Sequence, residues 1–329
     1  MTEMAGEVVI EKPELQILIN LLQEREKIRV SFPIYGTLLF TASPTERGYL
    51  LEVQAEKRDF HVRHPELPSY SDFYEAFISS GVITYDNIED FKEMLELYRI
   101  LRKGVVFSPD TNIFYHRFIS NYRPLDGYQI VVAEDVKNEI ESAMNYKYRS
   151  NYLHEIMSTV KNGHLLRELS NRRTKKARKA AYIALKEFEA LRDRIIVVER
   201  YGEGHNNDER IVKTLKHYDE MSPAMVVFLT ADLAITDVAR IEGLEYFYFE
   251  YPTARLGTHE VSAYQLRTLI FNLAAVLGLV EVNGTLVYGE FGGKKRLNEL
   301  KLIFRNGELQ REFLFHLNLC RKLEKIMEG

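Results

Sequence analysis

The feature that most constrains the fold is a series of short apolar runs in the middle of the chain, which alternate with amphipathic helical patterns. The runs are four or five residues long and lie at 104–107, 129–132, 195–198, 225–229 and 246–249. Parallel sheets that are buried on both faces by crossover helices have strands of this kind. The pattern therefore predicts an α/β domain with a parallel sheet over residues 103–255.

Residues 1–102 have a different pattern, which predicts a small α+β N-terminal domain. Pro13 stands where a helix can begin, and leucine and isoleucine residues follow it at helical spacing. Further along, strand-like stretches are separated by a turn-rich segment, and helical patterns come after a loop that contains two prolines. The predicted elements are strands at 28–41 and 49–58 and helices at 71–79 and 87–102.

The tail, residues 256–329, predicts a second small α+β domain. Its first amphipathic helix ends near Gly278, a residue suited to the position just after a helix. The dipeptide Asn283-Gly284 separates two strand-like stretches and favours a type I′ hairpin turn. A last helix begins near Gln310. Two interpretations stay open: the tail forms a winged-helix-like domain of its own, or it completes the N-terminal domain.

Composition narrows the functional classes. Hydrophobic residues make up 46% and charged residues 28% of the chain, as in folded globular proteins. The net charge of −4 means that any surface for nucleic acid is a local patch. Cys320 is the only cysteine, so an internal disulfide is excluded, and we expect its side chain to be buried. With no leader pattern and no apolar run long enough for a bilayer, we expect a cytoplasmic protein without membrane contact.

Acidic residues follow four of the predicted strands. They are Asp110 after the first, Glu139 in the helix after the second, Asp208 at the next helix start, and Asp232 and then Asp237 after the fourth. Taken singly, each acid is more readily explained as a helix cap or a solvent-facing residue, but independent caps have no reason to fall in this order and spacing. However, ligands of open parallel sheets bind beyond the carboxyl ends of the strands. We therefore expect the acids to gather at one edge of the sheet.

Carboxylates gathered in this way favour a divalent cation. They repel one another, and burial raises their pKa values unless a cation neutralises them. Oxygen ligands with several negative charges suit Mg²⁺ or Mn²⁺ better than zinc. Metal ions held by carboxylates activate water and stabilise the reacting oxygens in phosphodiester cleavage. The acids therefore predict metal-dependent phosphodiester hydrolysis.

The sequence around these acids resembles the PIN-domain family in four motifs. They are VVFSPDTNI at 105–113, IVVAEDVKNEI at 130–140, DERIV at 208–212 and FLTADLAITDVARIEG at 228–243. The first has a strand that leads into Asp-Thr-Asn, and the fourth has Thr-x-Asp ahead of a helix. The first and fourth motifs together carry most of the resemblance, which covers about 150 residues and not the flanking regions.

The resemblance implies a doubly wound parallel sheet and an endoribonuclease that depends on Mg²⁺ or Mn²⁺. It implies catalytic roles for five acids, of which four ligate metal and Asp237 is auxiliary; the four ligands are Asp110, Glu139, Asp208 and Asp232. By the same resemblance Asn112 and Thr230 hold the carboxylates through hydrogen bonds. PIN domains often pair, so the resemblance also implies a homodimer.

A helical insert at 145–192 departs from the family pattern, because it separates the second and third motifs widely. It carries a basic run that we expect to contact RNA phosphates, formed by Arg172, Arg173, Lys175, Lys176, Arg178 and Lys179. The run is also explained as a solvated helix face. Nearby tyrosines are candidates for stacking on unpaired bases, namely Tyr146, Tyr148, Tyr152 and Tyr182.

The sequence thus predicts a multidomain endoribonuclease that binds RNA and uses Mg²⁺ or Mn²⁺. Two alternatives stay open, a structure-specific DNA nuclease and a catalytically silent RNA-binding scaffold. The complete set of acids favours an enzyme over a scaffold.

Overall fold

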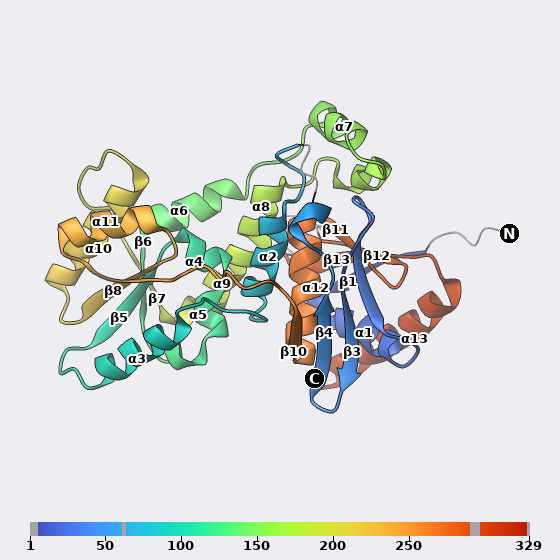
Figure 1. Cartoon of the computed structure of the whole chain (residues 1–329), viewed down its shortest axis with the longest axis horizontal. Helices are drawn as coiled ribbons and strands as arrows, with labels where there is room; N and C mark the ends of the chain where they lie inside the picture. Colours follow the sequence, from blue (N-terminus) through green and yellow to red (C-terminus); the bar gives the residue numbers. More distant parts are fainter. Residues whose placement is uncertain (1–5, 61–63, 290–296, 328–329) are drawn as a thin grey trace. The chain divides into compact units, whose positions relative to one another are not determined.

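The computed structural model describes residues 6–60, 64–289 and 297–327 (Figure 1). The chain divides into two compact units. Residues 1–76, 147–178 and 255–329 form one, and residues 77–146 and 179–254 form the other. We call the first the antiparallel unit and the second the parallel unit, after the sheet that each contains.

The sheet of the parallel unit has five strands, all parallel, in the order β7-β6-β5-β8-β9. Their bounds are β5 Val105–Pro109, β6 Ile130–Ala133, β7 Ile195–Val198, β8 Met225–Thr230 and β9 Glu245–Tyr248. The chain runs outward from β5 to β7 and then returns to β8 on the other side of β5. The strand order therefore reverses between β5 and β8, which confirms the predicted doubly wound α/β fold.

Helices cover this sheet and bury its central strands. They are α3 Ile88–Arg99, α4 Thr111–Tyr115, α5 Phe118–Asn121, α6 Glu134–Ala143, α9 Leu185–Ala190, α10 Asn207–Met221 and α11 Leu233–Glu242. Every residue of β6 and every residue from 226 to 230 of β8 is buried. Successive side chains of a strand point to opposite faces, so both faces of the sheet are covered, which explains the uninterrupted apolar runs.

The antiparallel unit contains one eight-stranded sheet in the order β1-β13-β12-β11-β2-β3-β4-β10. Its strands are β1 Gly6–Glu11, β2 Ile28–Phe32, β3 Thr37–Thr45, β4 Gly48–Val53, β10 Thr258–Val261, β11 Leu279–Val282, β12 Thr285–Tyr288 and β13 Glu299–Phe304. Strands from the tail pair with N-terminal strands at three places, β1 with β13, β2 with β11 and β4 with β10. The tail therefore completes the N-terminal domain and is not a winged-helix-like domain of its own. Alone, each half would expose unpaired strand edges.

The remaining helices are α1 Leu15–Gln23, α2 Tyr70–Ser79, α7 Ser150–Ser158, α8 Lys175–Lys179, α12 Ala263–Leu277 and α13 Gly307–Met327. Helix α12 contacts strands β4, β10, β11 and β12, and Figure 1 shows it running across the sheet. It ends at Gly278, which has a φ of 91°. In the hairpin that follows, Asn283 and Gly284 both have positive φ, 41° and 84°. A type I′ turn requires this conformation, so the predicted hairpin is confirmed.

Two other expectations differ from the structure. The insert predicted at 145–192 does not stay together, since residues 147–178 belong to the antiparallel unit and the following residues to the parallel unit. Cys320 is exposed, so the prediction of a buried thiol is wrong.

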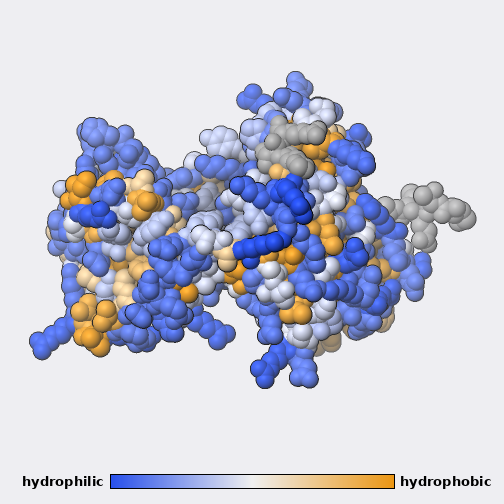
Figure 2. Space-filling view, in the orientation of Figure 1, coloured by the Kyte–Doolittle hydropathy of each residue, from blue (hydrophilic) through white to orange (hydrophobic). Residues whose placement is uncertain are grey.

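Among the described residues, no helix is long and apolar enough to cross a membrane. Hydrophilic residues cover much of the face shown in Figure 2, with small apolar patches between them.

Candidate active site

Asp110 lies directly after the central strand β5, at the carboxyl edge of the parallel sheet. Its carboxylate accepts a hydrogen bond from the backbone N–H of Ile113 at 2.8 Å and another from the hydroxyl of Thr230. The side chain is buried. Burial raises its pKa to about 6, the charge of Asp232 adds to this, and the hydrogen bonds oppose it. Asp110 thus caps helix α4, and its carboxyl group keeps its proton to a higher pH than an ordinary aspartate does.

Thr230 ends strand β8 and connects two of the acids. Its hydroxyl donates to Asp110 and accepts from the backbone N–H of Asp232 at 3.0 Å. Asp232 caps helix α11, because its carboxylate accepts from the N–H of Ala234 at 2.9 Å. Since β5 and β8 are neighbours at the point where the strand order reverses, these residues flank the crevice in which such sheets bind ligands.

Glu139 projects from helix α6, and Thr111 holds it. The hydroxyl of Thr111 donates to its carboxylate at 2.9 Å, and the side-chain amide of Asn207 donates to the same oxygen at 3.4 Å. The predicted holding residues were Asn112 and Thr230, so neither of these two donors to Glu139 was among them. Asn112 is exposed, and no hydrogen bond joins its side chain to an acid within the described ranges. Its place in the sequence could have indicated Thr111 as a donor, because Thr111 directly follows Asp110 at the first position of helix α4.

Asp208 lies in the first turn of α10, two residues after the capping residue Asn206. Partial burial raises its pKa, and the charges of Asp232 and Glu139 raise it further. Since Asp232 also raises the pKa of Asp110, the four acids form one group of mutually repelling charges. The structure thus brings together the four acids that the sequence places after strands.

Asp237 does not join this group. It lies on α11 with an exposed side chain and forms an ion pair with Arg240 one turn later, at 3.2 Å. Asp237 is therefore occupied by a surface contact, unlike the other four acids.

No lysine or arginine forms an ion pair with any of the four acids in the described part of the chain. The nearby guanidinium of Arg210 contacts Asp135 at 3.5 Å and Asn207 at 2.9 Å instead. Four carboxylates without a protein cation attract a metal ion. Their oxygen atoms fit Mg²⁺ or Mn²⁺.

The side chains do not form a closed metal cage. Over the described residues, no three His, Cys, Asp or Glu side chains converge closely enough to hold an ion by themselves. Mg²⁺ usually keeps several water molecules and binds through one or two carboxylates plus substrate phosphates. An open group of carboxylates suits this ion, whereas zinc requires a compact ligand set.

The basic run of the insert is largely committed to contacts within the protein. Arg178 is buried, and its guanidinium donates to the carbonyl oxygens of Arg173 and Ala275 at 2.7 and 2.8 Å. The predicted RNA contact of Arg178 is therefore wrong, because its donors satisfy the carbonyl oxygen of Arg173 and one near the end of α12. Lys175 pairs with Asp72 at 2.9 Å.

The other residues of the run differ in exposure. Lys176 is exposed, whereas Arg172, Arg173 and Lys179 are half-buried. Of the tyrosines proposed for stacking, Tyr148 and Tyr182 are buried, and Tyr146 and Tyr152 are exposed.

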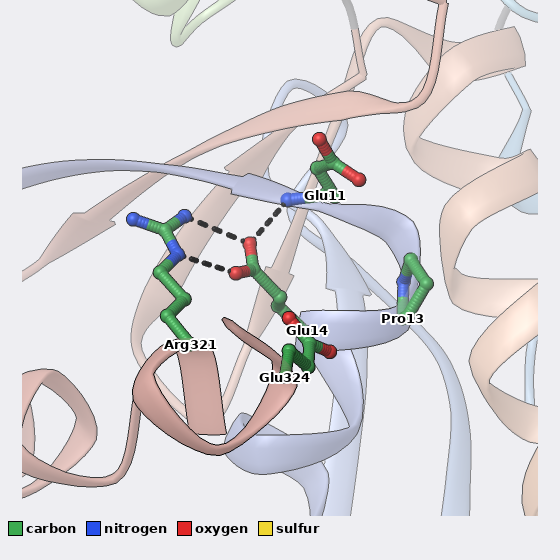
Figure 3. Close-up of a pocket in the computed structure, with 5 residues that line it drawn as sticks. All are labelled: Glu11, Pro13, Glu14, Arg321 and Glu324. Carbon is green, nitrogen blue, oxygen red and sulfur yellow. Dashed lines mark hydrogen bonds and ion pairs between the residues drawn. The ribbon is translucent and has the colours of Figure 1, made fainter. Parts of the chain in front are cut away.

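A hollow of about 370 Å³ lies in the antiparallel unit, lined by Glu11, Pro13, Glu14, Arg321 and Glu324 (Figure 3). Arg321 spans both carboxylate oxygens of Glu14, at 2.6 and 2.9 Å. The same carboxylate accepts from the backbone N–H of Glu11 at 2.6 Å. These groups satisfy one another, and the hollow contains none of the acids described above.

Comparison with known proteins agrees with this geometry. A family model described as PIN domain matches residues 107–250, a range that contains all five strands of the parallel sheet except the first residues of β5. No curated protein matches the chain. The PIN domain has a nuclease-like fold, and the match includes Asp110, Glu139, Asp208 and Asp232. Residues 107–250 of this chain therefore belong to the PIN domain family and have further regions on both sides.

Proposed function

We propose that this protein is a metal-dependent endoribonuclease that hydrolyses phosphodiester bonds at the edge formed by Asp110, Glu139, Asp208 and Asp232. One observation carries the proposal. The charge of Asp232 raises the pKa of both Asp110 and Asp208, that of Glu139 also raises the pKa of Asp208, and no lysine or arginine within the described residues pairs with the four acids. Repulsion of this kind lowers stability unless a cation binds, so its presence in a nuclease-like fold points to a metal-dependent function.

A bound Mg²⁺ or Mn²⁺ ion would supply an activated water and stabilise the charge that develops on the phosphate. The residues of the chain would set the geometry. Thr230 orients the carboxylate of Asp110, and Thr111 orients that of Glu139. Because both threonines lie at junctions between strands and helices, their side chains have little freedom.

Proton binding competes with cation binding at this edge. Without a cation, Asp110 is half protonated at a pH of about 6. As the pH falls below this value, a shrinking fraction of Asp110 carries the charge that attracts an ion. We therefore expect cleavage to rise with pH through this range, since the ionised form is the one that binds metal.

The choice of RNA as substrate rests on the resemblance of the four motifs, and DNA is its principal rival. The deciding experiment is to incubate the protein with single-stranded RNA, structured RNA and matched DNA, with Mg²⁺ or Mn²⁺ and with a chelator. We expect metal-dependent cleavage of RNA that Asp110→Asn abolishes.

Asp126→Asn is the matched control, because Asp126 is an exposed aspartate of the same unit and the substitution makes the same chemical change. Equal cleavage by the wild type and Asp110→Asn would refute the proposed site. Binding of RNA without any cleavage would support a scaffold instead.

A further inference from the structure

Tyr201 presents an aromatic ring to solvent beside helix α10, the helix whose first turn carries Asp208. It follows strand β7 by three residues, and its side chain is 51% exposed. The ring stacks on His217 of helix α10, with ring centroids 3.6 Å apart and planes inclined by only 7°. One face of the tyrosine is thus covered by the histidine.

Contacts with α10 hold the segment that carries this ring. The backbone N–H of Tyr201 donates to the hydroxyl of Thr214 at 3.1 Å. The amine of Lys213 donates to the carbonyl oxygen of Glu203 at 3.3 Å. Gly202, with a φ of 73°, makes the turn between these contacts. A ring that is already oriented loses little conformational entropy when a ligand binds to it.

The position of the ring relates it to the candidate active site. Asp208 lies in the first turn of α10, and His217 lies nine residues later on the same helix. At 1.5 Å per residue, this separation is roughly 13 Å along the helix. A strand with a phosphate at Asp208 that continues along α10 would bring a base within about two nucleotides of the cut to Tyr201. Arg200 beside it is an exposed cation that suits a phosphate, whereas Lys213 contacts Glu203 and Glu209 and the exposed neighbours Glu199 and Glu203 are acidic.

We propose that Tyr201, backed by His217, is a stacking platform for an unpaired base of the RNA strand that is cut. This inference rests on the proposed function. An exposed aromatic ring with one backed face suits an unpaired base of single-stranded nucleic acid, because every base has a π-face. The same surface does not fit a paired base, whose faces are covered by its neighbours in the helix.

The test measures binding in the Asp110→Asn background, so that no RNA is cut. The probes are a fluorescent oligouridylate and an RNA duplex of equal length. We expect Tyr201→Ala to raise the Kd for oligouridylate roughly 5- to 100-fold, the range found for loss of one stacked base. Tyr201→Phe and Tyr201→Trp keep an aromatic ring and should restore binding, with little change for the duplex in any variant.

Phe315→Ala is the matched control, because Phe315 is an exposed aromatic residue of the antiparallel unit and is 66% exposed. An unchanged Kd in Tyr201→Ala overturns the inference, as does an equal loss for the duplex or a failure of Tyr201→Phe to restore binding. Absence of oligouridylate binding by the parental protein also overturns it. If RNA is bound through Tyr201 but the wild type cuts nothing, the proposed nuclease fails and the platform stands.

Discussion

The hydroxyl of Thr230 donates a hydrogen bond to the carboxylate of Asp110, and both side chains are buried. The two residues end neighbouring parallel strands, β8 and β5, on either side of the point where the strand order reverses. Burial favours the protonated form of Asp110, whereas this hydrogen bond favours the ionised form. Thr230 therefore helps to keep a buried carboxylate available for a cation.

We predict that Thr230→Val moves the acid limb of the pH–activity profile to higher pH. Valine fills the same space but cannot donate, so the pKa of Asp110 rises above its value of about 6. We expect a loss on the order of tenfold in kcat/KM at pH 6, given the usual strength of a hydrogen bond to a charged group, and recovery at higher pH. Thr236→Val is the control, since Thr236 is also buried but donates to Leu233. A pH profile that matches the wild type would contradict the role of Thr230.

We predict that Asp110→Asn stabilises the protein in the absence of divalent ions. The pKa of Asp110 is about 6 when folded and 3.8 in its ordinary state, so the folded protein binds more protons between these values. The stability of the wild type therefore falls as pH rises through this range, and the loss is complete above it. Asparagine carries no charge and escapes this loss, by about 1–3 kcal/mol at neutral pH.

Urea denaturation at acidic and neutral pH, with a chelator present, checks this prediction. Added Mg²⁺ should reverse the order, because it stabilises only the protein that binds it. A variant less stable than the wild type at neutral pH in chelator would show that burial of the ionised Asp110 carboxylate does not destabilise the folded protein.

We predict that Asp237→Asn changes cleavage by no more than about twofold, in the range expected when only an exposed ion pair is lost. Resemblance to the family assigns an auxiliary catalytic role to Asp237, but its carboxylate is exposed and pairs with Arg240. Initial rates at saturating Mn²⁺ decide between these views. A loss as large as that of Asp110→Asn would restore Asp237 to the active site.

We predict that Arg178→Met destabilises the antiparallel unit by about 2–4 kcal/mol and leaves RNA affinity unchanged. The guanidinium satisfies the carbonyl oxygens of Arg173 and Ala275 in a buried position, and methionine satisfies neither. Lys176→Met is the control, because Lys176 is exposed and should change stability by less than about 0.5 kcal/mol. Reduced RNA affinity with unchanged stability in Arg178→Met would support the original interpretation of the basic run.

Much of the parallel sheet could be predicted from the sequence, because strands buried on both faces leave uninterrupted apolar runs. The run at 195–198 coincides with β7, and the others differ from the observed strands only at their ends. The antiparallel sheet was harder to predict. The pairing of β2 with β11 depends on contacts between residues about 250 positions apart, such as Val30 and Val282. Neither strand has a local sequence pattern that identifies the strand with which it pairs.

The candidate site divides in the same way. The acids could be located, because each follows a strand and parallel strands end at one edge. Their hydrogen-bond donors could not all be located, since the choice between Thr111 and Asn112 depends on which side of a short helix faces Glu139. The burial of Arg178 could not be predicted either, because a basic run on a helix has the same sequence pattern whether or not one of its residues is buried.

The pairing of β1 with β13 has a consequence for the order in which the protein folds. Gly6 lies opposite Phe304, so β1 gains its one neighbour among the described strands only after β13 has been made. The parallel unit, by contrast, is complete once residue 254 has been made. Pairings between distant residues form slowly, because the intervening chain must first be brought together. We therefore expect the parallel unit to mature before the antiparallel sheet, because the edge strand β1 can pair only after β13 has been made.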